Sequence, residues 1–182
     1  ASGPVGAYGI IPVFSDVMHY GNWYHAAPSL LNLSIDPEKS GKAAIFRALQ
    51  ENAAIVAARN LSAIFKLSGK TPDKIVFAAG ASKSAHWSQI LSDATGLPVV
   101  TPVVKEATAL GCAAAAAIGI GLRRDFVEAA EGWVRWDKRF EPNFEHKAIY
   151  DDAGERWARA YALQRQLVDE GVRGRSDRAV RG

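Results

Sequence analysis

The segment from Phe77 to Val99 holds the residues of this chain whose types and spacing best suit ligand binding. An apolar run ends in Ala79, Gly80 and Ala81, and a polar–apolar pattern typical of a helix follows. A helix N-terminus has unpaired N–H groups and partial positive charge, so it attracts anions. Small residues before it let a ligand approach the backbone closely. The pattern therefore suits a phosphate or the ribose of a nucleotide, and it equally suits a tight turn that binds nothing.

Two other short motifs resemble known signatures but lack a required residue. Gly69-Lys70-Thr71 resembles the end of a phosphate-binding loop, yet Ile64 stands where that motif needs glycine. The run Gly80-Ala81-Ser82-Lys83-Ser84 resembles the nucleophile elbow of serine hydrolases, yet it ends in serine instead of glycine. Neither a P-loop enzyme nor a serine hydrolase is therefore predicted.

The histidines and the single cysteine do not form a recognisable metal site. No pair among His19, His25, His86 and His146 has the spacing of helical ligands, and Cys112 has no second cysteine. We expect the histidines to be surface or hydrogen-bonded residues and Cys112 to be a small core residue of an alanine-rich helix. No metal ligand and no catalytic residue is assigned within this chain.

The composition is that of an ordinary globular protein. Of 182 residues, 48% are hydrophobic and 23% are charged, with a net charge of +3. Much of the positive excess lies in residues 172–182, a predicted flexible tail whose arginines have no aromatic residues between them. No apolar run is long enough to span a bilayer. We expect a cytoplasmic protein that binds neither nucleic acid nor a membrane, and, because it begins without methionine, a piece of a longer chain.

Strands and helices are predicted to alternate along the chain. The predicted strands span residues 8–14, 30–35, 73–79 and 97–104, and the predicted helices span residues 36–68, 82–95, 107–118, 125–134 and 145–170. Pro98 and Pro102 predict that the last strand is an edge strand or an interrupted one. Tyr150, Trp157 and Tyr161 are predicted to share one face of the last helix. The alternation indicates the α/β class with some parallel pairing.

Two motifs in this order give the chain a family resemblance. Trp87, Gln89 and Asp93 form a W-x-Q-x-x-x-D pattern, and "EATALG" follows from Glu106 to Gly111. Together they resemble the C-terminal half of the FGGY carbohydrate kinases, and the likeness extends over residues 8–171. Glu106 itself is expected to be structural, as an acid in the first turn of a helix.

Two further segments support and narrow this resemblance. "FRALQE", which contains Arg47, Ala48 and Glu51, resembles the R-A-x-L-E helix of the family. "PVFSDVMHYGNWYHAAPSLLNLSIDP" resembles the autoinducer-2 kinase branch. Ala27-Pro28-Ser29 and Leu33 depart from the pattern of mainstream sugar kinases and fit that branch.

The resemblance implies a fold and a nucleotide site. The fold is an actin-like, ribonuclease H-like ATPase domain with a mixed sheet flanked by helices. Residues 1–171 would form most of the C-terminal nucleotide-binding domain, and residues 172–182 would form the basic tail. The adenine-nucleotide turn of the family falls on Ala79, Gly80 and Ala81, and Ser84 stands where some members place an adenine-contacting asparagine. Ala79 replaces the more usual glycine.

The resemblance also implies an activity that this chain cannot perform alone. The catalytic aspartate and the first phosphate-binding hairpin of the family lie upstream of this region, so the chain by itself is expected to be inactive. The intact enzyme would use ATP and Mg²⁺ to phosphorylate a sugar-like substrate, autoinducer-2 (4,5-dihydroxy-2,3-pentanedione), with the N-terminal domain of the same kinase as partner. A homodimer is compatible with the sequence.

Two alternatives stay open at this point. The substrate could instead be a pentulose or a sugar alcohol. The chain could also be a non-catalytic remnant or a partner-binding module, with the aromatic loop around Trp23 and Tyr24 as its interaction patch.

Overall fold

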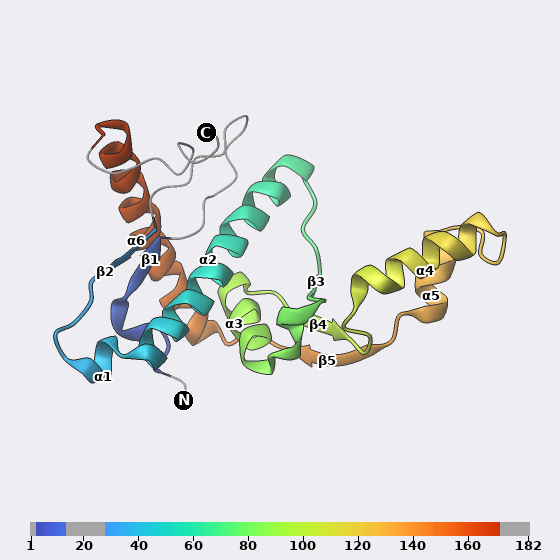
Figure 1. Cartoon of the computed structure of the whole chain (residues 1–182), viewed down its shortest axis with the longest axis horizontal. Helices are drawn as coiled ribbons and strands as arrows, with labels where there is room; N and C mark the ends of the chain where they lie inside the picture. The colour runs from blue at the N-terminus through green and yellow to red at the C-terminus, as the bar shows by residue number, and fades with distance from the viewer. Residues whose placement is uncertain (1–2, 14–27, 172–182) are drawn as a thin grey trace, which may run out of the picture.

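The structure, a computed structural model, describes residues 3–13 and 28–171 (Figure 1). The helices are α1 (Pro37–Ser40), α2 (Lys42–Ser68), α3 (Ala85–Thr95), α4 (Ala107–Gly119), α5 (Phe126–Trp133) and α6 (Phe144–Asp169). The strands are β1 (Ile11–Val13), β2 (Ser29–Leu31), β3 (Ile75–Val76), β4 (Val99–Pro102) and β5 (Trp136–Phe140). This alternation confirms the predicted α/β class. The predicted tail at 172–182 and the aromatic loop around Trp23 and Tyr24 lie outside the described residues.

The strands form a mixed sheet in the order β3-β4-β5 and a separate antiparallel pair, β1-β2. β3 runs parallel to β4, and β5 runs antiparallel to it. Residues 97–104 were predicted to form an edge strand or an interrupted one. The edge-strand alternative was wrong, because β4 is the buried central strand, whereas its register is interrupted between Thr101 and Pro102. Pro98 precedes the strand, and Pro102 is its last residue, where the register shifts, so neither proline removes a ladder hydrogen bond from its middle.

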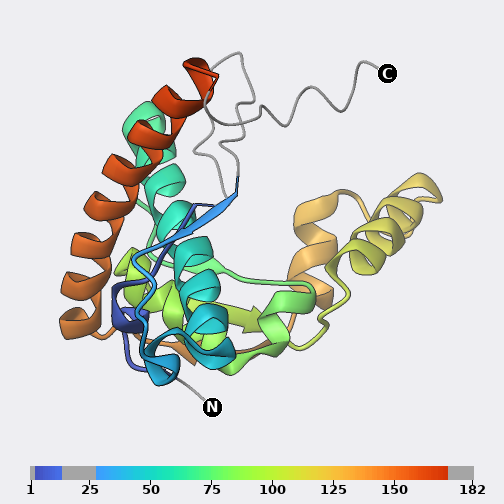
Figure 2. The same ribbon diagram turned by 60° about the vertical axis from the view of Figure 1, so that its left-hand side comes forward.

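The main core lies where α2, α3 and α6 pack against β4 (Figure 2). Its buried members are Ala54, Ile55, Ile90, Leu91, Ala94, Val99 and Tyr150. A second cluster joins β1 to α2 and α6 through Val13, Val56, Trp157 and Tyr161. The rings of Trp157 and Tyr161 stack with centroids 5.1 Å apart. Tyr150, Trp157 and Tyr161 are all buried, so the predicted shared face of the last helix is confirmed.

Helices α4 and α5 form an arm that projects away from this core (Figures 1 and 2). On α4 only Ala114 and Ala117 are buried, although its sequence is almost entirely apolar. Cys112 is exposed, so its prediction as a core residue was wrong. In the described part of the chain, α5 is the one helix that packs on α4, and most of the α4 surface is therefore left uncovered.

A buried polar network ties the helices of the core to one another. Arg47 and Glu51 on α2 are 6% and 4% exposed, and Arg47 Nε donates to Glu51 Oε1 over 2.6 Å. The same oxygen accepts from the Tyr150 hydroxyl and from the backbone N–H of Gly6, each at 3.1 Å. Arg47 also donates to the Tyr150 hydroxyl at 3.0 Å and to His86 Nε2 at 2.8 Å. The network therefore joins α2 to α3, to α6 and to the N-terminal turn.

Burial and the charges of this network shift the pKa values of Arg47 and Tyr150. Burial alone would lower the pKa of Arg47, but the Glu51 carboxylate outweighs it and the net shift is upward. Burial, and then the negative charge of Glu51, raises the pKa of Tyr150. Arg47 and Glu51 are therefore an ion pair, and Tyr150 is a neutral donor and acceptor between them.

We expect Glu51→Ala to destabilise the protein by about 3–5 kcal/mol, because it leaves the Arg47 charge buried without its partner. The matched control is Asp152→Ala. It breaks an exposed Arg156–Asp152 ion pair with the same spacing along a helix, and it should cost less than about 1 kcal/mol. Urea unfolding of both variants measures the difference. Equal losses of stability would show that the buried Arg47–Glu51 pair contributes no more to stability than the exposed pair.

Candidate functional site

The predicted nucleotide turn lies at the carboxyl end of β3. Because β3 and β4 are parallel, the residues that follow each strand lie at the same edge of the sheet. In open α/β sheets this edge is where ligands bind. The turn after β3 and the start of α4 after β4 are joined there by an ion pair of 3.1 Å between Lys83 and Glu106. Glu106 is the N-cap residue of α4 but makes no side-chain capping bond, so its observed contact is this ion pair.

Ala79 has a backbone conformation that is normally confined to glycine. Its φ is 67° and its ψ is −164°. A non-glycine residue in this region carries strain of about 1–3 kcal/mol, and such strain persists where the surrounding structure enforces it. Here Ser82 enforces it, because its backbone N–H and its hydroxyl both donate to the Ala79 carbonyl, at 3.1 and 2.7 Å. The turn therefore holds a fixed, strained shape at an exposed position.

Gly80 leaves open space beside the turn. A Cβ atom placed on Gly80 would meet none of the described atoms within 4 Å, and its φ lies outside the left-handed region. Ala79 and Gly80 are exposed, whereas Ala81 and Ser84 are half-buried. The residues predicted to contact the nucleotide thus lie together, and the space over Gly80 fits a group that must approach the backbone closely.

Helix α3 begins later than the sequence predicted. The expected start at Ser82 was wrong, because Gly80–Lys83 forms a 3-10 turn and α3 starts at Ala85. Ser84 is the N-cap residue, and its hydroxyl oxygen accepts from the Trp87 N–H at 3.2 Å. One acceptor site of Ser84 is therefore used inside the protein, while its O–H remains able to donate to a ligand. Contact between Ser84 and adenine stays a prediction.

Trp87 and Gln89 of the W-x-Q-x-x-x-D motif join α3 to neighbouring segments of the chain. Trp87 packs edge-on against Phe77, the residue that follows β3, with ring centroids 6.4 Å apart, so the segment before the turn is fixed to the helix after it. Gln89 Nε2 donates to Asp93 Oδ1 at 2.7 Å and to the Glu141 carbonyl at 2.8 Å. The Trp87 contact thus fixes α3 relative to the segment before the turn, and the Gln89 contact fixes α3 relative to Glu141, which follows β5.

Asp93, the last residue of the motif, anchors α3 to the start of α6. It is 2% exposed. Its Oδ1 accepts from the backbone N–H of Asn143 at 2.9 Å, and its Oδ2 bonds to His146 Nδ1 at 2.9 Å. The motif therefore has a positioning role in this structure. His146 and His86 are both hydrogen-bonded, as predicted, while His19 and His25 lie outside the described residues.

His86 lies in the first turn of α3 and faces Arg47. Because Arg47 can only donate, Nε2 of His86 must be the acceptor of their hydrogen bond, which requires a neutral ring. Desolvation of the ring, and then the charge of Arg47, lowers the pKa of His86 below its ordinary value. The helix that follows the turn is therefore joined to the buried network through a neutral histidine.

Residues 3–13 and 28–171 contain no cluster of three or more His, Cys, Asp or Glu side chains that could hold a metal ion. No helix in this part of the chain is long and apolar enough to cross a membrane.

The family follows from comparison with known proteins. Residues 2–120 match the profile of the C-terminal domain of the FGGY family of carbohydrate kinases. The chain belongs to this family. It is 56% identical to the autoinducer-2 kinase of Yersinia enterocolitica and 58% identical to that of Salmonella typhimurium, in each case over 169 residues. Each match covers 93% of this chain and 32% of the relative, so the chain spans about a third of the length of these curated FGGY kinases.

Solved structures confirm the fold. The xylulose kinase from Lactobacillus acidophilus matches with a TM-score of 0.71 and 21% identity, over 91% of this chain and 32% of that one. The glycerol kinase from Plasmodium falciparum, solved with ADP, matches with a TM-score of 0.62 and 21% identity, over 82% of this chain and 31% of that one. The chain thus has the actin-like ATPase fold of the FGGY kinases, with the mixed sheet that was predicted.

We expect Ala79→Gly to stabilise the protein by about 1 kcal/mol, since relief of strain exceeds the entropic cost of glycine. The control is Ala81→Gly, in the same turn but without a positive φ, which should destabilise by about 0.5–1 kcal/mol. The midpoints of urea unfolding curves, compared at an unchanged slope m, give both changes in stability. If both substitutions destabilise alike, Ala79 is not strained.

Stability should depend on pH through His86. Its folded pKa lies below the ordinary value of 6.5. The stability that neutral His86 contributes is therefore fully present above the pKa of histidine in the unfolded chain. It is lost as the pH falls through the pKa of His86 in the folded protein. His86→Gln keeps an acceptor for Arg47 but does not titrate. Unfolding at about pH 8 and about pH 5 should show a larger loss for the wild type than for this variant. Equal losses would contradict the assignment of the lowered pKa.

Proposed function

We propose that this chain is the nucleotide-binding C-terminal part of a cytoplasmic, Mg²⁺- and ATP-dependent kinase that phosphorylates a hydroxyl of autoinducer-2. The single observation that carries the nucleotide role is the turn at Ala79–Gly80, strained at Ala79 and open over Gly80, at the carboxyl ends of the parallel strands. Strain of this kind occurs mainly at functional sites. The substrate is proposed from relatives of 56–58% identity that carry the name autoinducer-2 kinase.

The residues of this chain are proposed to bind and orient the nucleotide. Ala79, Gly80 and Ala81 would lie against it, and Ser84 would donate its hydroxyl hydrogen to the base. ATP would supply the phosphoryl group, and Mg²⁺ would bind to the phosphates of ATP. The described residues include no cluster of three or more His, Cys, Asp or Glu side chains that could hold a metal ion. Phosphoryl transfer depends on positioning and charge stabilisation, so the groups that perform it are assigned to the upstream part of the kinase.

The upstream part of the same kinase is proposed as the partner of the α4–α5 arm. A helix that is apolar on all sides is normally buried, yet α4 is mostly exposed in the described chain. Beside it lies an apolar hollow of about 350 Å³, whose larger lining residues include Val76, Leu110, Phe126, Trp133 and Trp136. The relatives are about three times as long as this chain, so they have the polypeptide to cover this surface.

The test uses the full-length protein and Gly80→Ala. The new methyl group meets no described atom within 4 Å, so the fold and its unfolding midpoint should not change. It would occupy the space assigned to the nucleotide, and ATP affinity should fall at least about tenfold, ~1.4 kcal/mol. The control is Gly119→Ala, which also meets no described atom but lies at the far end of α4; it should bind ATP normally. Titration calorimetry measures both.

The same preparations decide the activity. The wild type should transfer phosphate from ATP to autoinducer-2 faster than to pentuloses or sugar alcohols, and Gly80→Ala should raise the KM for ATP. Preference for a pentulose would favour the alternative substrate. If the full-length protein neither binds nor hydrolyses ATP, the chain is part of a non-catalytic module and the kinase proposal fails.

A further inference from the structure

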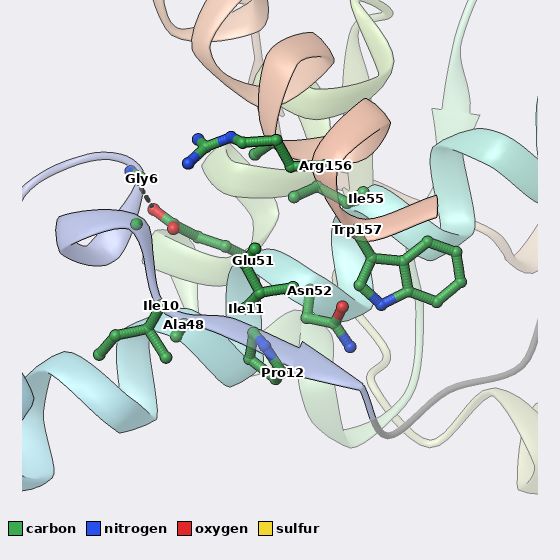
Figure 3. Close-up of a pocket in the computed structure, with 12 residues that line it drawn as sticks. Gly6, Ile10, Ile11, Pro12, Ala48, Glu51, Asn52, Ile55, Arg156 and Trp157 are labelled. Carbon is green, nitrogen blue, oxygen red and sulfur yellow. Dashed lines mark hydrogen bonds between the residues drawn. The ribbon is translucent and has the colours of Figure 1, made fainter. Parts of the chain in front are cut away.

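A small cavity between α2, α6 and β1 is lined by two buried side chains that carry polar atoms, Asn52 and Trp157 (Figure 3). Asn52 of α2 is 4% exposed and Trp157 of α6 is 2% exposed. Among the described residues, neither Asn52 Oδ1 nor Trp157 Nε1 has a hydrogen-bond partner. Orphaned buried polar atoms are rare in folded proteins and each one costs free energy.

The two orphaned atoms are complementary. The Trp157 indole N–H can only donate, and Asn52 Oδ1 can only accept. Figure 3 shows the indole nitrogen on the side of the ring that faces Asn52. Both side chains line the same cavity, of about 20 Å³. A water molecule needs roughly 10–15 Å³ and two or more polar partners. The volume therefore fits one water, which would both accept a hydrogen bond and donate one.

The remaining walls of the cavity are mostly apolar, and the partly exposed Arg156 of α6 also lines it. Ile11 and Pro12 of β1 and Ile55 of α2 contribute apolar surface, and the turn containing Gly6 and Gly9 lies at its side. Glu51 also lines the cavity, but its Oε1 already accepts from Arg47, Tyr150 and Gly6. The ring of Trp157 is fixed by stacking on Tyr161, so its N–H cannot turn away toward solvent. A ligand that satisfies both orphans must therefore enter the cavity itself.

We propose that this cavity binds one structural water, which accepts from Trp157 Nε1–H and donates to Asn52 Oδ1. The water adds a second link between α2 and α6, beside the hydrogen bonds of Tyr150 to Arg47 and Glu51. It is a binding site separate from the nucleotide turn, and it explains why asparagine occupies a buried position between Glu51 and Ala53.

A crystal structure of the full-length protein at about 1.8 Å or better tests this directly. We expect one well-ordered water within hydrogen-bonding distance, roughly 2.7–3.2 Å, of both atoms. Either of two results would overturn the proposal. One is a cavity without density for a water. The other is a side-chain arrangement in which Trp157 Nε1 donates straight to Asn52 Oδ1.

Variants give a second, independent readout. Trp157→Phe removes the donor and keeps a ring that can stack on Tyr161, and Asn52→Leu removes the acceptor with little change in size. Each single variant leaves one orphan, so its thermal midpoint should fall. The double variant should lose less than the sum of the two, and its crystals should contain no water in the cavity. Additive losses, or a water that keeps full occupancy in the double variant, would contradict the proposal.

Discussion

The arrangement of the whole domain depends on the buried ion pair between Arg47 and Glu51. Two charges removed from water must be paired and fully hydrogen-bonded, or they become a large penalty. The chain satisfies them with groups from different elements: Tyr150 from α6, His86 from α3 and the backbone of Gly6. Each of these elements must therefore lie where it does for the pair to be stable. The requirement fixes α3 relative to α2, and α3 begins where the proposed nucleotide turn ends.

The turn itself is held from several sides. Ser82 donates to the Ala79 carbonyl, Ser84 caps the helix that follows, and Trp87 packs on Phe77, which follows β3. These contacts maintain a backbone conformation at Ala79 that an isolated peptide would avoid. A turn preorganised in this way can present backbone groups to a ligand without paying an ordering cost on binding. This is the physical basis for assigning the nucleotide to this turn.

The sequence was informative wherever the signal was local. The turn, the helix after it and the buried aromatic face of α6 follow from spacing and small residues. Partners far apart in the chain were not predictable in this way. Asp93 was recognised as part of a motif, but its partners Asn143 and His146 lie some fifty residues away. Similarly, the prolines in residues 97–104 favoured an edge strand. That alternative failed because nothing in the local sequence shows that β5 pairs with the other side of β4.

The exposed ion pair at the site could not be predicted from the local sequence either. The ion pair of Lys83 and Glu106 forms only because β3 and β4 are parallel and end at the same edge. In the same way, Cys112 was predicted to be buried from its apolar neighbours, yet the described chain leaves most of α4 uncovered. Composition identifies an apolar helix correctly, but it does not show which part of that helix is buried in this chain.

The most direct test of the account is a crystal structure of the full-length protein with ADP. The account predicts that the nucleotide lies against Ala79–Gly80, with its base within reach of the Ser84 hydroxyl and the backbone of the turn unchanged. A nucleotide bound elsewhere, with the space over Gly80 filled by protein from the upstream part of the chain, would contradict the central claim.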